Sequence, residues 1–396
     1  GKTLSPMDLK NPKSSLSGNE PILKETKNWY LPMDKLQGNI EKYIETKKDW
    51  KSNVIGQCKS WLNDGLKPRA MTRDLDWGVS VPLKDADGKV LYVWFDAPIG
   101  YITATKELDS KNWEKYWKDK DTSLVHFIGK DNIVFHTIIF PMMLMEHGDY
   151  ILPENVPANE FMNLEGEKIS TSRNWAVWLH EYLNDFPNMQ DELRYCLITN
   201  LPENKDSDFS WKDFQQKNNN ELVAILGNYI NRVFVLCDKF FDKKVPKPLD
   251  DNVDNEIFSE LDELKGKVEL SIQNFKFREA MSYVIDVARL GNKYLTDTEP
   301  WKIFEENPER VKDIIHNSVQ IVANISILCE PFIPFTSKKI KELLNISDIN
   351  WSNASSSIVN AGHEISGKAH IFSKIEDKAI EDLSLIHISE PTRRSD

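Results

Sequence analysis

The sequence lacks three features that define large classes of protein. No apolar run approaches the roughly 18 residues that a membrane-spanning helix needs. The four cysteines lie far apart and show neither the spacing of a metal site nor the framework of a disulfide-rich domain. An excess of positive charge is also missing, since 62 acidic and 50 basic residues give a net charge of −12. These absences argue against a membrane protein and against general attraction to nucleic acid, and the cysteine usage suits a reducing cytoplasm.

What is present suits a large protein with more than one core. The 396 residues are 40% hydrophobic, enough for two or three domains. Because the net charge is negative, RNA binding would require local patches and base stacking. The lysine-rich runs at residues 243–247 and 338–341 are predicted to be solvated faces.

The most informative segment is VWFDAPIGY, residues 93–101. It lies between a predicted strand over residues 90–96 and a helix-like segment. Strand ends that lead into helices are where α/β sheets place ligand sites. Aromatic residues beside a Pro-Gly turn are more often core or turn residues, so this segment does not decide the function by itself.

A second segment is HFIGKD, residues 126–131. Residues 124–128 are predicted to form a short buried strand, and Gly129 permits a tight turn after it. Asp131 would then start the next helix, where its carboxylate could bind a ribose or simply cap the helix. His136 follows in an apolar helix, where a lone histidine is usually a core residue.

A third segment is GEKISTSR, residues 166–173. Lys168 supplies a point charge, and the hydroxyl residues after it supply directed donors, a combination that can bind polyphosphate. Displacement at phosphorus is catalysed mainly by positioning and charge neutralisation. A polar surface loop is an equally good interpretation of this segment alone.

Together, in this order and spacing, the three segments resemble those of methionyl-tRNA synthetases, which are class I aminoacyl-tRNA synthetases. Residues 9–18 (LKNPKSSLSG) are similar to the segment after the family's zinc knuckle, and Arg73-Asp74 fits as well. The resemblance covers about residues 1–375. It implies a partial α/β Rossmann-type class I synthetase catalytic domain, followed by an all-α anticodon-binding helical bundle.

The resemblance also implies site residues. Aromatic walls suit the soft thioether of methionine. The residues that match the methionine pocket are Trp94, Ala97, Pro98, Tyr101, Asn132, Phe135, His136 and Arg73. Those that match the ATP site are Gly129, Asp131, Lys168, Ser170, Thr171 and Ser172, with Lys168 and Asp131 as catalytic residues. Thr171 stands where the common family string has a second lysine. Arg173 could supply the positive charge that this lysine would provide.

From residue 218 onward the pattern predicts long amphipathic helices, and residues 191–200 also predict a helix. One apolar face has spacings of three and four: Leu222, Leu226, Tyr229, Val233, Leu236 and Phe240. Residues 256–296 and 308–345 repeat this pattern, as an antiparallel bundle would. Residues 351–362 are rich in Ser and Asn and predict a loop.

Three residues of the predicted bundle are candidates for RNA contact. Asn228 and Arg232 are four apart, hence neighbours on a helix, and Trp301 follows Pro300 in a first helical turn. Amide and guanidinium groups can recognise unstacked bases, and aromatic rings stack on them. The alternatives are a surface polar pair and a capping tryptophan. By the resemblance, all three match positions that recognise a CAU anticodon.

The activity that the resemblance implies is a methionine–tRNA ligase in two steps. Methionine attacks the α-phosphorus of ATP to give methionyl-adenylate, and tRNA(Met) then takes the methionyl group. Mg²⁺ is expected with ATP. The sequence leaves the oligomeric state open. Alternatives are another class I synthetase, a non-catalytic tRNA-binding protein, and an unrelated nucleotide-binding α/β enzyme.

We expect the chain to be a fragment. It has no His-x-Gly-His string, which belongs to the first half of the family's catalytic domain, so it should not catalyse adenylation alone. A structural Zn²⁺ is expected only in that upstream part. Residues 383–394 (LSLIHISEPTRR) resemble a translated sequencing adapter and are left out of the fold prediction.

The predicted boundaries follow from these assignments. They are the remainder of an inserted connective domain (1–85), the second half of the catalytic domain (86–150), a stem-contact region with the lysine loop (151–215), the anticodon-binding domain (216–375) and a tail (376–396).

Overall fold

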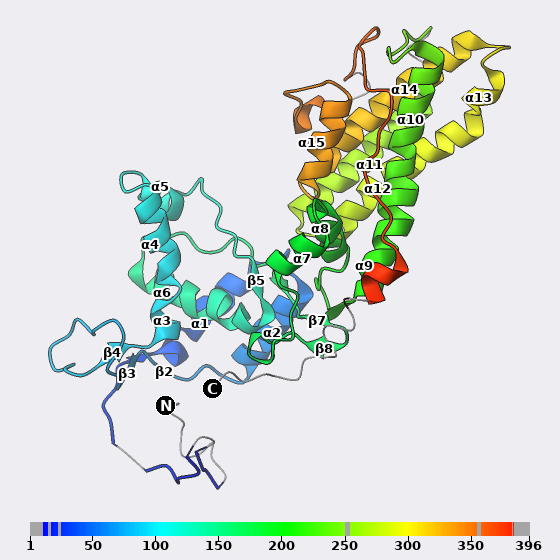
Figure 1. The fold of residues 1–396 in the computed structure, drawn as a ribbon. Helices are drawn as coiled ribbons and strands as arrows, with labels where there is room; N and C mark the ends of the chain where they lie inside the picture. Colours follow the sequence, from blue (N-terminus) through cyan, green and yellow to red (C-terminus); the bar gives the residue numbers. More distant parts are fainter. Residues whose placement is uncertain are drawn as a thin grey trace. The chain divides into compact units, whose positions relative to one another are not determined.

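The protein is described by a computed structural model that covers residues 11–14, 17–22, 25–249, 254–354, 358–381 and 383. The chain divides into two compact units, Gly1–Pro157 and Ala158–Asp396 (Figure 1). Part of the segment 9–18 and almost all of residues 383–394 lie outside the described residues.

The first unit consists of short helices connected by two-residue strands. Its elements are β1 (Tyr30–Leu31), α1 (Met33–Glu45), α2 (Ser52–Asn63), β2 (Arg69–Ala70), β3 (Thr72–Arg73), β4 (Val90–Leu91), α3 (Val93–Asp96), α4 (Ile99–Leu108), α5 (Trp113–Lys118), β5 (Ile128–Gly129) and α6 (Phe140–His147). β1 pairs with β2 and β3 with β4, both antiparallel. Residues 86–150 contain both strands and helices, but they do not alternate as predicted, because α3, α4 and α5 follow one another between β4 and β5.

The prediction of a strand over residues 90–96 is wrong beyond Leu91. The partner strand β3 supplies only two pairs, and the amide of Tyr92, which is still extended, makes the last bond to this side, to the carbonyl of Met71 at 2.8 Å. From Val93 the backbone is helical, and the carbonyl of Tyr92 accepts hydrogen bonds from the amides of Phe95 and Asp96 at 2.7 and 3.2 Å. Aromatic and β-branched residues favour a strand only where a neighbouring strand can pair with them. Here the backbone satisfies its hydrogen bonds locally instead.

The extended conformation predicted for residues 124–128 is confirmed, but its continuous burial is not. The amides of His126 and Ile128 donate to the carbonyls of Asn155 and Pro157 at 3.1 and 3.2 Å. Side chains alternate, because His126 is 6% exposed and Phe127 is 62% exposed. The segment leads into a 3₁₀ turn at Lys130–Asn132 and a π-helical turn at Phe135–Ile139, directly before α6.

The second unit begins with a small sheet and continues as a helical bundle. Its elements are β6 (Ala158–Asn159), β7 (Met162–Leu164), β8 (Glu167–Lys168), α7 (Leu179–Asp185), α8 (Gln190–Thr199), β9 (Ser207–Phe209), α9 (Trp211–Lys217), a π-helical stretch at Asn218–Gly227, α10 (Asn228–Phe241), α11 (Asn255–Gln273), α12 (Phe277–Thr298), α13 (Pro300–Ile303), α14 (Pro308–Leu328) and α15 (Pro334–Leu343). β7 is antiparallel to β8 and parallel to β9.

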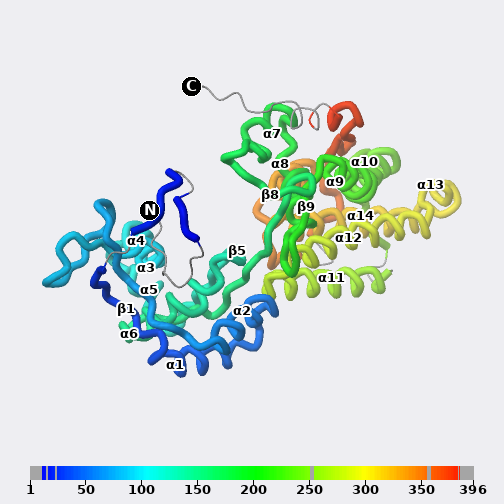
Figure 2. The backbone as a smooth tube through the Cα atoms, turned by 90° about the horizontal axis from the view of Figure 1, so that it is seen from below, coloured from blue at the N-terminus to red at the C-terminus, as the bar shows by residue number. Residues whose placement is uncertain are grey.

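The helices of this bundle agree with the sequence. The helix predicted at residues 191–200 is α8, and the predicted apolar face is buried from Leu222 to Leu236, with Phe240 half-buried against Phe304. Helices α10, α12 and α14 lie side by side around the main core (Figures 1 and 2). At Gly291 of α12 a Cβ atom would lie 2.2 Å from the Tyr229 ring, so α10 and α12 approach closely.

The predicted surface segments have mixed outcomes. Lys338 and Lys339 are exposed, whereas Lys341 is partly buried and pairs with Glu330 at 2.9 Å. In the Ser- and Asn-rich segment a 3₁₀ turn occurs at Trp351–Asn353, and residues 355–357 lie outside the described residues. None of the helices in the described ranges is long and apolar enough to cross a membrane.

All four cysteines are buried free thiols. Burial raises the pKa of every one of them, to about 12 for Cys196 and Cys237. A thiol in such surroundings stays protonated and is a poor metal ligand or nucleophile. The cysteines therefore act as small core residues.

A polar network connects three helices of the bundle. Asp254, at the start of α11, accepts hydrogen bonds from both terminal nitrogens of Arg310 at 2.7 and 2.8 Å. The hydroxyl of Tyr294 at the end of α12 donates to the same carboxylate at 2.6 Å. Burial opposes ionisation of Asp254, but these hydrogen bonds outweigh it and hold its pKa below the usual value.

The first prediction concerns this carboxylate. We expect Asp254→Asn to lower the free energy of unfolding by about 1–3 kcal/mol at pH 7, because Arg310 keeps its burial but loses its charged partner. The pKa of Asp254 is lower in the folded state than in the unfolded state. The stabilisation by its charged form is therefore complete above the unfolded-state pKa, and it is lost as the pH falls below about 4. Urea unfolding at pH 7 and pH 3 measures the free energy of unfolding at each pH. Asp262→Asn, an exposed change on α11, is the control, and equal losses from the two variants would contradict the prediction.

Candidate functional site

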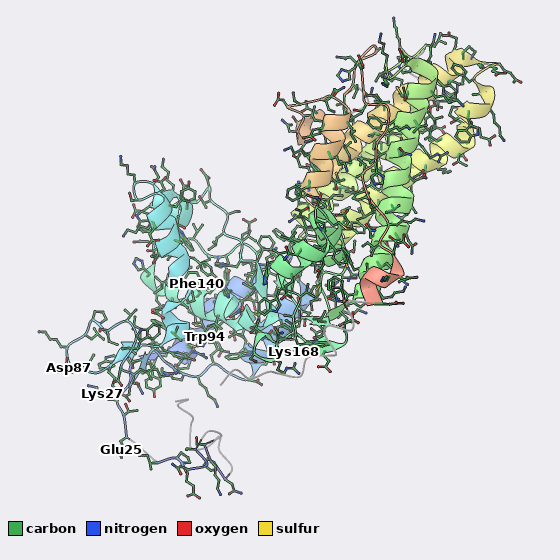
Figure 3. All side chains as sticks on the ribbon, in the orientation of Figure 1. Glu25, Lys27, Asp87, Trp94, Phe140 and Lys168 are labelled. Carbon is green, nitrogen blue, oxygen red and sulfur yellow. The ribbon has the colours of Figure 1, made fainter. Side chains whose placement is uncertain are left out.

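The predicted aromatic pocket residues form a cluster in the first unit. Trp94 of α3 faces Phe135 of the π-helical turn, with ring centroids 5.2 Å apart. Tyr101 of α4 lies 5.7 Å from His136 and 6.4 Å from Phe140. Figure 3 labels Trp94 and Phe140 in this unit. The short helix α3 and the π-helical turn thus bring together residues that are about 40 positions apart in the sequence.

Two hydrogen bonds fix the protonation of this cluster. Nδ1 of His136 lies 2.9 Å from the carbonyl oxygen of Asn132, which can only accept, so Nδ1 carries the proton. Burial lowers the pKa of His136, which favours the neutral ring. Nε2 of the neutral ring is then an acceptor, and the Tyr101 hydroxyl at 2.9 Å donates to it. The hydroxyl proton of Tyr101 therefore lies in the hydrogen bond to His136.

Other predicted residues border this cluster. Pro98 is buried at the start of α4, while Ala97 beside it is exposed. Asp131 is exposed in the 3₁₀ turn, and a Cβ atom at Gly129 would lie 2.9 Å from its Oδ1. Gly129 therefore leaves room for the Asp131 carboxylate, and Asn132 contributes its carbonyl to His136.

Arg73 packs beside this region, together with an arginine that the sequence analysis did not select. The Arg73 guanidinium lies 3.8 Å from the Tyr92 ring and donates to the carbonyl of Thr72 at 2.8 Å. The guanidinium of Arg69 lies 5.1 Å from the Phe135 ring. Arg69 thus contacts a predicted pocket residue, while Arg73 contacts the residue before α3. The sequence contained no signal for Arg69, because its partner is 66 positions away.

Two buried polar atoms in this unit have no hydrogen-bond partner among the described residues. They are Nε2 of His126 and Oδ1 of Asp96. His126 lies against Tyr101, His136 and Phe140, with ring centroids 5.0–5.9 Å away. The sequence analysis quoted His126 within its segment but assigned it no role.

The lysine loop lies in the second unit, on the β7–β8 hairpin. Lys168 ends β8 and is exposed, with its Nζ 5.6 Å from the Phe161 ring (Figure 3). Thr171–Arg173 form a 3₁₀ turn, in which the hydroxyls of Ser170 and Ser172 lie 3.2 Å apart. The Arg173 guanidinium donates to the carbonyl of Lys168 at 2.9 Å. The loop therefore presents two cations and three hydroxyls close together and exposed to water.

The three predicted anticodon residues also come together. The Arg232 guanidinium lies 5.3 Å from the Trp301 ring, which is 39% exposed. Both Asn228 and Arg232 donate to the side-chain oxygen of Asn292, at 3.3 and 3.2 Å. The amide nitrogen of Asn292 donates to the carbonyls of Ile225 and Ala288, each at 3.0 Å. Asn292 thus holds Asn228 and Arg232 together, and no local pattern in the sequence pointed to it.

Within the described ranges, no three His, Cys, Asp or Glu side chains gather in a way that could hold a metal ion. We therefore assign no protein ligand set to a metal.

Two protein-family models match consecutive parts of this chain. Residues 1–234 match the family of class I tRNA synthetases (M). Residues 248–387 match the anticodon binding domain of methionyl tRNA ligase. The chain belongs to the methionyl-tRNA synthetase family. Its fold is accordingly a class I synthetase catalytic domain followed by a helical anticodon-binding domain, as the sequence predicts.

Curated relatives align with almost the whole of this chain. The chain is 57% identical to the methionine–tRNA ligase of Cytophaga hutchinsonii over 395 residues, and 56% identical to that of Bacteroides fragilis over 384 residues. Each alignment covers 96% of this chain and 57% of the relative. The chain thus spans little more than half the length of these relatives.

Solved structures show the same fold. The chain superposes on the free-state methionyl-tRNA synthetase of Mycobacterium tuberculosis with a TM-score of 0.78 at 22% identity, covering 92% of this chain and 72% of that one. The structure of the same protein in complex with methionyl-adenylate gives a TM-score of 0.78 at 24% identity, over 91% of this chain and 71% of that one.

The second prediction tests the protonation of the aromatic cluster. Because the Tyr101 hydroxyl donates to the neutral form of His136, Tyr101→Phe should raise the pKa of His136. NMR titration of ¹⁵N-histidine-labelled chain measures this pKa. Tyr116→Phe, which changes an exposed tyrosine of α5, should leave it unchanged. An unchanged pKa in Tyr101→Phe would show that the hydroxyl does not donate to His136.

Proposed function

We propose that the protein containing this chain is a methionine–tRNA ligase. The observation that supports this most is the cluster around Tyr101 and His136, whose polar atoms are neutral and paired with one another. Such a cluster accommodates a soft, uncharged side chain such as a thioether and offers no partner for a charged one. High identity to curated methionine–tRNA ligases supports the same conclusion.

We propose that the residues of the aromatic cluster hold the amino acid. Trp94, Tyr101, Phe135 and His136 surround its side chain, with Ala97, Pro98 and Asn132 completing the wall. Arg73 supports this wall through its contact with Tyr92. Asp131 accepts hydrogen bonds from the ribose of ATP. Gly129, which has no side chain, leaves room for the Asp131 carboxylate.

The first chemical step is an in-line displacement. An oxygen of the methionine carboxylate attacks the α-phosphorus of ATP, the bond from that phosphorus to the bridging oxygen breaks, and pyrophosphate leaves. Lys168 provides charge for the departing phosphates, with Ser170, Thr171 and Ser172 as donors. Mg²⁺ would accompany ATP through its phosphates. Since the described residues gather no ligand set for it, no step is assigned to the ion.

The second step transfers the methionyl group. A hydroxyl of the terminal ribose of tRNA attacks the activated carbonyl carbon, and AMP leaves. In the bundle, Asn228, Arg232 and Trp301 contact the bases of a CAU anticodon, and Asn292 orients the first two. Stacking on Trp301 requires little net positive charge, in agreement with an acidic protein.

The domain boundaries and the cellular location are part of the same proposal. The domain division is the one predicted from the sequence, with the catalytic residues in 86–150 and 151–215 and the anticodon residues in 216–375. The ligase works in the cytoplasm, where methionine, ATP and tRNA meet.

The third prediction tests the ligase activity directly. The chain, rejoined to its upstream reading frame, should catalyse exchange of pyrophosphate into ATP when methionine is added. Leucine, isoleucine and valine should not support exchange, because their branched side chains do not match an unbranched thioether. Exchange with one of these amino acids would make the protein a different class I synthetase. Exchange with none of the four would favour a tRNA-binding protein without adenylation activity.

The fourth prediction concerns the anticodon. Trp301→Ala should reduce the preference for CAU over swapped anticodons by about 1–3 kcal/mol, because one stacking contact is lost. Filter binding of tRNA transcripts by this chain measures the preference. Trp61→Ala, which removes a tryptophan that is equally exposed (39%) in the first unit, should leave the preference intact. If the unmodified chain bound CAU and swapped anticodons equally, the anticodon assignment would be refuted.

A further inference from the structure

A groove on the second unit lies beside the three anticodon candidates but has no part in the steps above. Its cavity of about 260 Å³ lies between the start of α10, the π-helical stretch before it and the chain segment at residues 369–372, which runs beside α10 (Figure 1). Cavities that bind drug-sized molecules measure about 300–1,000 Å³, so this groove suits a smaller group such as one nucleobase. Its lining includes Val223, Gly227, Asn228, Asn231, His370 and Phe372.

The groove begins at the edge of the proposed anticodon site. In a helix with about 3.6 residues per turn, Arg232 lies about 40° to one side of Asn228, and Asn231 lies about 60° to the other side. Arg232 accordingly reaches Asn292 and the Trp301 ring. Asn231 lines the groove instead. Asn228 belongs to both places, because its amide nitrogen donates to Asn292 at 3.3 Å and its side chain also lines the groove. A base held at Asn228 therefore has the groove directly beside it.

The groove combines an apolar lining with exposed polar groups at its rim. A Cβ atom at Gly227 would lie 3.3 Å from the Phe372 ring, so the absence of a side chain lets this ring approach the helix closely. At the rim, Asn231 and His370 are exposed, and the Asn231 amide makes no hydrogen bond to the other described residues. An amide both donates and accepts, as the edges of bases do, and imidazole is one of the rings on which unstacked bases stack.

Hydrogen bonds hold the segment that carries His370 in place. Nε2 of His370 lies 2.9 Å from the hydroxyl oxygen of Ser373, which restrains the ring. Lys339 of α15 donates to the carbonyl of Ile371 at 3.3 Å. The amide nitrogen of Asn218 donates to the carbonyl of Ser373 at 2.9 Å. Because the segment is ordered before any RNA binds, little conformational entropy is lost on binding.

We propose, on the basis of the ligase function above, that this groove is a second base-binding site, which takes the unpaired nucleobase next to the one that contacts Asn228. Asn231 forms hydrogen bonds with the edge of this base, and His370 stacks against its face. The RNA surface therefore extends from the three anticodon candidates to the segment at residues 369–372. Its binding energy comes from stacking and hydrogen bonds, which suits a protein with a net charge of −12.

Binding of anticodon stem-loop RNAs to this chain tests the site. His370→Ala should weaken binding of the intact CAU stem-loop about five- to fiftyfold, because one stacking contact is lost. Asn231→Ala should weaken it about three- to tenfold, through the loss of hydrogen bonds. Loop positions in and beside the anticodon are then made abasic one at a time. At one of these positions, the abasic RNA should bind the unmodified chain and His370→Ala equally, because the base that His370 contacts is already missing.

Two further variants complete the design. His370→Phe keeps a flat ring and should bind the intact stem-loop nearly as well as the unmodified chain, and binding as weak as that of His370→Ala would contradict stacking. His147→Ala removes a histidine of the first unit whose side chain is 55% exposed, and it should leave binding unchanged. If His370→Ala weakened binding of every abasic RNA by the same factor, His370 would not contact a base.

The failure of this inference differs from the failure of the proposed function. If His370→Ala and Asn231→Ala bound the CAU stem-loop as tightly as the unmodified chain, while the preference for CAU persisted, the groove would be refuted and the anticodon assignment would stand. Equal binding of CAU and swapped stem-loops by the unmodified chain would instead refute the anticodon assignment and this inference with it.

A measurement on the unmodified chain requires no variant. In ¹⁵N-histidine-labelled chain, the ring resonances of His370 should shift when the intact CAU stem-loop is added. They should shift much less with the abasic RNA to which His370→Ala makes no difference. Equal shifts with both RNAs, or no shift with the intact one, would contradict a base in the groove.

Discussion

The hydrogen bond between Nδ1 of His136 and the carbonyl of Asn132 determines the chemistry of the first unit. Because a carbonyl oxygen only accepts, the bond fixes which nitrogen of His136 is protonated, and the direction of the Tyr101 hydroxyl follows from it. The cluster is then neutral and internally paired, apart from His126. These properties suit the soft, uncharged side chain that we propose the cluster binds.

In the second unit, the side-chain amide of Asn292 fixes the position of neighbouring polar side chains. Asn292 accepts from Asn228 and Arg232 and donates to two backbone carbonyls, so its orientation is fixed by four partners. Arg232 in turn lies beside Trp301. The surface proposed to contact RNA is thus held rigid before any RNA binds, which reduces the entropy lost on binding. The close approach of α10 and α12 at Gly291 is what brings Asn292 within reach.

Local patterns selected residues that lie together in the structure, but they did not reveal the residues that contact and hold them. Periodicity located the apolar face around Leu226, and the three segments around Trp94, Asp131 and Lys168 gave the family. The strand over residues 90–96 was wrong because pairing depends on the length of β3, which is distant in sequence. Arg69, His126 and Asn292 were missed because their partners lie 10 to 66 positions away or on another helix, and no spacing rule connects them. The π-helical turn at Phe135–Ile139 was missed as well, since its sequence is apolar like that of an ordinary helix.

The four buried thiols have a consequence beyond packing. Cys58 belongs to the first unit, and Cys196, Cys237 and Cys329 belong to the second. With their pKa values raised and their sulfur atoms covered, alkylating reagents reach them only when the surrounding structure opens. Pulse labelling of the thiols, followed by peptide mapping, would therefore measure when each unit opens, without any added probe. The native sequence carries its own reporters of local unfolding, one in the first unit and three in the second.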